Sequence, residues 1–229
     1  MQKLYTAVGR MQFKGRNKSV RCPMVLLGKK EFILDIQEMM LWSILNWRIL
    51  SDDEINTLYE AKAKETGYMT HRSVEECMKR LVQRGLVAEG CGELGADALY
   101  NLLSGLYVVP ISESPLLRLV SFIRLTVFEG ISYSVTKQIF SKDKRNNDEK
   151  KVMLLANQAM LSTAEIIKCA ELNAYEFRTE DELIDTLYHD EYTTSENIAH
   201  SVRFFSQCRP VITSVANLYL RKQIIFERM

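Results

Sequence analysis

The feature that most constrains the fold is the apolar spacing between residues 70 and 84. Apolar side chains recur there at positions i, i+3, i+4, i+7 and i+8, which lie along one side of an α-helix: Val74, Cys77, Met78, Leu81 and Val82. Thr70 can cap the start of this helix, and Gly85 stands where a left-handed residue would end it. The spacing predicts a helix over 70–84, followed by an extended run from Leu86.

Two more helices are expected before this one. The first spans 36–47, and we expect its tryptophans, Trp42 and Trp47, to be core or interface anchors. Ser51 with Glu54 three residues later predicts a capping box at the start of a second helix over 52–65. Residues 36–87 are therefore expected to form three short helices and a sharp turn.

The three helices closed by Arg84-Gly85-Leu86-Val87 resemble the winged helix-turn-helix domain of bacterial transcription regulators. The resemblance covers residues 36–95 and implies that a dimer binds duplex DNA through the third helix of each chain. Residues 88–95 occupy the wing position, and their three glycines make a tight turn easy. They contain no Arg or Lys, and residues 96–106 are spaced for a helix, where a typical wing would return as a strand.

A small β element is expected ahead of the first helix. Residues 4–13 are rich in strand formers, and short apolar runs follow at 24–27 and 32–34. Residues 28–30 fit a hairpin turn, and residues 14–19 fit a turn or flexible loop. These segments predict a small antiparallel sheet.

Charge is unevenly distributed, although the formal net charge is only +1. Residues 1–50 hold nine basic and three acidic side chains, and the second predicted helix is acidic. A basic N-terminal arm is what contact with a DNA backbone requires, and a solvated hairpin with ordinary lysines explains it equally well. The five cysteines are scattered without a CxxC or Cys/His cluster, so neither a disulfide framework nor a zinc site is indicated.

The second half of the chain is expected to be entirely helical. Ser114-Pro115 predicts a helix start, residues 141–151 a charged bridge, and residues 152–172 one long helix. Thr179 and Thr193 are expected to cap the next two helices, and Pro210 to open a terminal helix reaching 228. The expected fold is mainly α with a small β element. It comprises an N-terminal winged-helix-like domain, residues 1–110, and a C-terminal all-α domain, residues 111–229.

The outward side of the third helix is the candidate site. By the winged-helix resemblance, Arg72 and Ser73 would read bases, and Lys79 and Arg80 would hold phosphates. The expected DNA-binding residues are His71, Arg72, Ser73, Lys79, Arg80 and Gln83 on the helix, with Lys14, Arg16 and Lys18 on the arm. Glu75 and Glu76 oppose this assignment, because each carboxylate must be desolvated near phosphates unless it accepts a hydrogen bond from a cytosine amino group. The alternative is a solvated amphipathic helix of mixed charge.

No enzyme is indicated, because the sequence has no phosphate-binding glycine loop, nucleophile elbow or HExxH motif. His189 and His200 match no common metal-ligand spacing and are best read as solvated side chains. Aromatic and Met side chains of the helical half could line a ligand pocket, but core packing explains them more simply: Met153, Met160, Phe204, Phe205 and Tyr219. We therefore expect no cofactor, metal or catalytic residue.

Two functions fit these observations. The first is a cytoplasmic DNA-binding regulator whose helical half dimerises or binds an effector. The second is a non-enzymatic adaptor or chaperone-like protein that binds another protein through its helical half. The N-terminus lacks a signal-peptide core and no run reaches membrane-spanning length, so we expect a cytoplasmic protein without a membrane partner.

Overall fold

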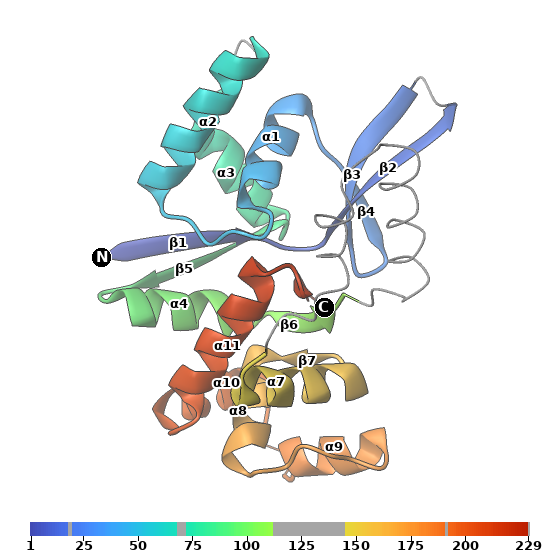
Figure 1. Cartoon of the computed structure of the whole chain (residues 1–229), viewed down its shortest axis with the longest axis vertical. Coiled ribbons are helices and arrows are strands. Elements are labelled where there is room, and N and C mark those ends of the chain that lie inside the picture. The colour runs from blue at the N-terminus through green and yellow to red at the C-terminus, as the bar shows by residue number, and fades with distance from the viewer. Residues whose placement is uncertain (18–19, 68–71, 112–144, 191, 229) are drawn as a thin grey trace, which may run out of the picture.

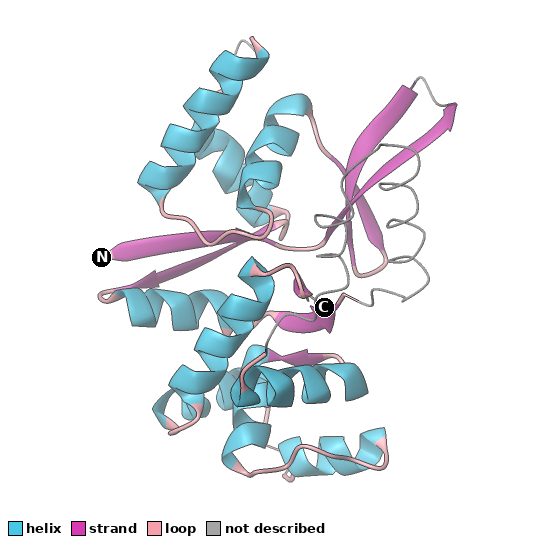
Figure 2. Cartoon of the chain, viewed as in Figure 1, coloured by secondary structure: helices cyan, strands magenta, loops and turns pink. Residues whose placement is uncertain are grey.

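The computed structural model describes residues 1–17, 20–67, 72–111, 145–190 and 192–228 as helices and small antiparallel sheets (Figures 1 and 2). The helices are α1 Ile36–Leu45, α2 Asp52–Thr66, α3 Val74–Gln83, α4 Gly95–Leu103, α7 Asn147–Gln158, α8 Thr163–Glu171, α9 Glu180–Leu187, α10 Ser195–Ser201, the 3-10 helix η3 Val202–Phe204 and α11 Cys208–Leu220. The strands are β1 Gln2–Ala7, β2 Arg10–Asn17, β3 Val20–Leu27, β4 Lys30–Ile33, β5 Val87–Gly92, β6 Tyr107–Pro110, β7 Leu161–Ser162 and β8 Ile224–Glu227.

The three expected N-terminal helices are present, on one side of the antiparallel pair β1–β5, while α4 covers the other side (Figure 1). Trp42 is buried and donates its indole N–H to the carbonyl of Leu86, at 3.0 Å. Tyr5 of β1 exchanges both backbone hydrogen bonds with Leu50, just before α2. β1 thus lies between the turn after α1 and the strand that follows α3.

The wing expectation needs correction at the glycines. They serve a close approach of helix and strand, because a Cβ on Gly90 would lie 2.3 Å from the backbone nitrogen of Leu102. A Cβ on Gly92 would likewise lie 2.4 Å from the backbone nitrogen of Ala98 in α4. Both glycines lie within β5, which pairs with the N-terminal strand β1.

The expected small β element is present as the antiparallel sheet β2–β3–β4. Gly28, with φ +56, makes the tight turn from β3 to β4. Residues 14–17 are part of β2, where a turn or flexible loop was expected.

The expectation of an all-helical C-terminal half is wrong. β6 pairs antiparallel with both β7 and β8, so strands from the two halves form one sheet. The terminal helix ends at Leu220, and Lys222, with φ +60, turns the chain into β8. The run Ile224-Ile225-Phe226 fits a helical period as well as a buried strand, which explains the error.

Other boundaries also differ from expectation. The helix expected over 152–172 is two helices, α7 and α8, because Ser162 and Glu165 form a capping box that starts a new helix. The cap expected at Thr193 is formed by Thr194, and the cap expected at Thr179 is confirmed. The helix expected from Ser114 and the remainder of 112–144 lie outside the described residues.

Two buried apolar clusters hold the chain together. One consists mainly of side chains from β1, α1, α2, α3 and β5, together with Val25 of β3, Leu34 and Leu86. The other joins Val8 and Ala88 to the helices and strands after residue 99. This second cluster contains residues of both halves. The expected domain boundary near residue 110 stays a prediction.

Candidate functional site: the outer side of the third helix

Helix α3 presents one buried and one exposed side. Ser73 caps its start by accepting a hydrogen bond from the N–H of Glu76, and Gly85, with φ +73, ends it. The buried side of the helix carries Cys77, Met78 and Leu81. The helix begins at Val74, so the expected start at Thr70 is wrong, and Arg72 and Ser73 precede the first turn.

Arg72 is tied to the start of α1. Its guanidinium donates to Asp35, the capping residue of α1, and its carbonyl accepts from the side chain of Gln37 at 2.7 Å. Partial burial would raise the pKa of Asp35, but the N–H of Glu38 and the Arg72 guanidinium outweigh it and hold the pKa below its usual value. Arg72 therefore has its charge largely balanced by a carboxylate of its own chain.

Arg80 and Arg84 share a second carboxylate of α1. Glu38 is almost fully buried, with 2 % of its side chain exposed, and lies 3.2 Å from Arg80 Nε and 2.9 Å from Arg84 Nη1. Arg84 also donates to the carbonyl of Ile33. The two arginines thus neutralise a buried charge that would otherwise be costly. The Glu38–Arg84 pair ties the start of α1 to the end of α3, and we call this pair the clamp.

The remaining predicted residues of α3, Lys79 and Gln83, are exposed and line a groove of about 590 Å³ between α2, α3, β1 and β5. Its floor contains apolar side chains from α2 and α3: Ile55, Val74, Met78 and Val82. Its charged lining consists of Lys3, Lys79, Asp52, Glu75 and Glu89, two basic and three acidic groups. We call this the α3 groove.

Sequence reasoning missed the walls of the α3 groove that come from β1, α2 and β5. Lys3 and Glu89 reach it because β1 and β5 pair, which no local pattern indicates. Burial and the neighbouring carboxylate of Asp52 raise the pKa of Tyr5, which lines the groove as well. The signal that could have been used for the arginines is Asp35-x-x-Glu38, a capping box with two carboxylates.

The basic arm and the third helix are not brought together by any described contact. Lys14 forms an exposed ion pair with Glu31 of β4, at 2.8 Å. Arg16 lies in β2, and its side chain is outside the description. Lys18 and His71 lie outside the described residues.

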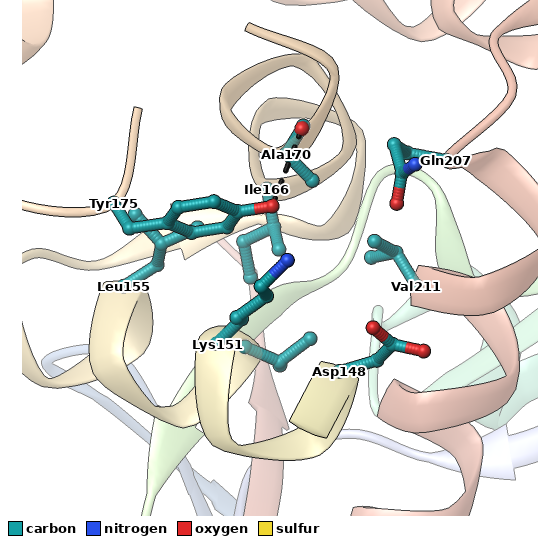
Figure 3. A pocket seen from close by; sticks show the side chains of 9 residues that line it. Asp148, Lys151, Leu155, Ile166, Ala170, Tyr175, Gln207 and Val211 are labelled. Atoms are coloured by element: carbon teal, nitrogen blue, oxygen red, sulfur yellow. Dashed lines mark hydrogen bonds between the residues drawn. The ribbon is translucent and has the colours of Figure 1, made fainter. Parts of the chain in front are cut away.

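The helical half contains a small hollow. A hollow between α7, α8 and α11 measures about 10 Å³, room for about one water molecule (Figure 3). Lys151 and Tyr175 both line this hollow, and the Lys151 ammonium lies over the Tyr175 ring, 4.6 Å from its centroid. Of the side chains considered for a pocket, Met153 and Tyr219 are core residues, whereas Met160 and Phe204 are exposed.

Other features bear on partners and metals. Within the described ranges, no helix combines the length and apolar character needed to span a bilayer. No group of three or more His, Cys, Asp or Glu side chains there could hold a metal ion. His189 is exposed and pairs with Asp190, and His200 is exposed on α10.

Comparison with known proteins adds no assignment: no protein-family model, curated protein or solved structure matches this chain. Any functional conclusion therefore rests on the α3 groove and its surroundings.

Proposed function

We propose that the protein is a non-enzymatic adaptor whose α3 groove binds a segment of another protein. The observation that carries this proposal is the charge balance around α3. Arg72 and Arg80 are paired with Asp35 and Glu38, and the groove itself holds three carboxylates and two lysines. Residues 35–95 carry eleven acidic and seven basic side chains, so this unit has an excess of negative charge.

The chemistry of the groove defines the partner. Its apolar floor would take the buried side of an amphipathic segment, and its acidic groups would face basic side chains on that segment. Phosphates would instead meet Asp52, Glu75 and Glu89 directly. The fitting occupant is thus an amphipathic protein segment that carries lysine or arginine.

Photo-crosslinking in cells of the source organism tests this assignment. A benzophenone side chain at Gln83 lines the groove, whereas one at Thr213, exposed on α11, is the control. We expect a protein adduct from position 83 only, weakened by Glu75→Lys and unaffected by Glu60→Lys, an exposed change on α2 outside the groove lining. A nucleic-acid adduct at position 83, or adducts unaffected by Glu75→Lys, would contradict the proposal.

DNA binding by a cytoplasmic, dimeric regulator is the second candidate. It is favoured by the three-helix arrangement with an exposed third helix that presents Lys79, Arg80 and Gln83 to solvent. If this candidate is correct, affinity for nonspecific duplex DNA falls steeply with salt, and Lys79→Ala lowers the slope of log K against log salt by about 1. Absence of binding at low salt would exclude it.

A further inference from the structure

We infer that the C-terminal half contains a second copy of the three-helix unit, and that this copy turns its α3-like face inward, onto the first copy. The second copy consists of β6, α7, β7, α8, α11 and β8. It corresponds to β1, α1, the Leu50 bridge, α2, α3 and β5, with α9 and α10 inserted before its third helix. This inference concerns architecture and does not depend on the proposed function.

The strand arrangement is the first line of evidence. In the first copy, β1 pairs with Leu50 before the second helix and with β5 after the third. In the second copy, β6 pairs with β7 before the second helix and with β8 after the third. All of these pairings are antiparallel, so a leading strand lies between the same two later segments in both copies.

The helix starts repeat at a fixed distance. Asp35 with Glu38 and Asn146 with Glu149 form capping boxes on the first helices. Ser51 with Glu54 and Ser162 with Glu165 do the same on the second helices. Each residue lies 111 positions after its counterpart, and so do Leu161 after Leu50 and Ile166 after Ile55.

The third helices end alike. Gly85 N–H bonds to Val82 O and Leu86 N–H to Leu81 O. Lys222 N–H bonds to Tyr219 O and Gln223 N–H to Leu218 O, the same pair of bonds. Gly85 and Lys222 both have left-handed backbones, with φ +73 and +60.

The clamp is repeated as well. Arg221, at the end of α11, donates to Glu149, at the start of α7, as Arg84 does to Glu38. Glu149 is almost as buried as Glu38, with 4 % of its side chain exposed. Burial opposes ionisation, but Arg221 and the backbone of Asn146 keep the pKa of Glu149 below its usual value. A buried carboxylate joined to a helix-terminal arginine thus occurs at equivalent places in both copies.

The two copies differ in the surface of the third helix. Glu75, Lys79 and Glu89 are exposed in the first copy. Their counterparts, 137 positions later, are Ile212, Ala216 and Phe226, and all three are buried. The same backbone arrangement therefore carries exposed charged side chains in one copy and buried apolar side chains in the other.

Helix α4 and parts of the first copy cover that face. α4 contacts α11, which runs between α4 and α7 in Figure 1. The hydroxyl of Tyr219 accepts a hydrogen bond from the main-chain N–H of Trp47 at 2.9 Å and donates one to the carbonyl of Ala7 at 3.3 Å. Gly9 N–H bonds to Phe226 O at 2.8 Å. In the second copy, this surface is therefore a packing contact within the chain.

Thiol labelling of the full chain tests the orientation. Cysteine is placed at Lys79, at its counterpart Ala216, and at Thr213, an exposed position on α11, and modification is followed peptide by peptide. We expect positions 79 and 213 to react in the native protein, and position 216 to react on the order of 100-fold more slowly, because it must wait for opening. Ile212→Cys replaces Ala216→Cys if the latter does not fold. Native reactivity at position 216 or 212 equal to that at 79 would overturn the inward orientation.

Double-mutant cycles test the repeated clamp. Glu38→Gln with Arg84→Met, and Glu149→Gln with Arg221→Met, are compared by their urea midpoints. We expect each double variant to lose less than the sum of its singles, in both copies, because each single variant removes one partner of the ion pair and the second substitution then has less to lose. Coupling in the first cycle but strict additivity in the second would overturn the equivalence of the clamps, and neither result depends on any binding partner.

Discussion

Replacing Gly90 by alanine tests how closely helix α4 is held against β5. A Cβ at this position would lie 2.3 Å from Leu102 N and 2.4 Å from Ala98 O, both main-chain atoms of α4. No side-chain rotation can relieve that overlap, so the helix must move by roughly 1 Å to reach ordinary contact distances. Leu102 and Leu103 are buried on α4, so such a shift disturbs the core shared by both halves.

We expect Gly90→Ala to lower the free energy of unfolding by about 3 kcal/mol, at the upper end of overpacking costs. For a chain of this size that is a fall in Tm of about 6–12 °C. Urea and thermal unfolding followed by circular dichroism measure it. Gly105→Ala is the matched control, because a Cβ there meets nothing within 4 Å, and it should change stability by less than about 0.5 kcal/mol. A loss below about 1 kcal/mol for Gly90→Ala would refute the close contact.

Three further predictions concern the contacts that join and end the elements. Tyr219→Phe should cost about 1–2 kcal/mol in urea unfolding, because it leaves the N–H of Trp47 without its partner. Glu149→Gln should flatten the dependence of stability on pH. The lowered native pKa of Glu149 stabilises the fold fully above its unfolded value of about 4.3, and that contribution is lost as pH falls through the native pKa. Gly85→Ala should cost about 1 kcal/mol, since φ +73 disfavours a side chain, and Gly67→Ala, at φ +64, should cost about the same.

Local patterns predicted what depends on neighbours in the chain. The first three helices follow from apolar spacing, and the capping box of Ser51 and the turn at Gly28 follow from local side-chain and backbone chemistry. What could not be predicted is pairing at long range. The pairing of β1 with β5 and the contact of Arg72 with Asp35 depend on three-dimensional packing. The predicted cationic surface of the third helix is for this reason a groove of mixed charge, with Arg72 and Arg80 paired to carboxylates of α1 and its cap.

The strand at the C-terminus shows a different limit. Ile224, Ile225 and Phe226 continue the apolar spacing of α11, so period alone favours a longer helix. The decisive feature is Lys222, whose left-handed backbone closes the helix as Gly85 closes α3. Lysine carries no such signal by itself, and only comparison with the first copy would have revealed it.

The distribution of charge bears on which partner the α3 groove would accept if the proposed function is correct. Attraction to DNA would have to come from the basic first fifty residues, because residues 35–95 hold eleven acidic against seven basic groups. At physiological ionic strength attraction between exposed charges is screened beyond roughly 8 Å, and of those basic residues only Lys3 is among the residues named as lining the groove, beside three carboxylates. A protein segment avoids this conflict, since it can place its own basic side chains beside Asp52, Glu75 and Glu89. The proposed protein partner therefore fits the charges of the groove better than a phosphate backbone does.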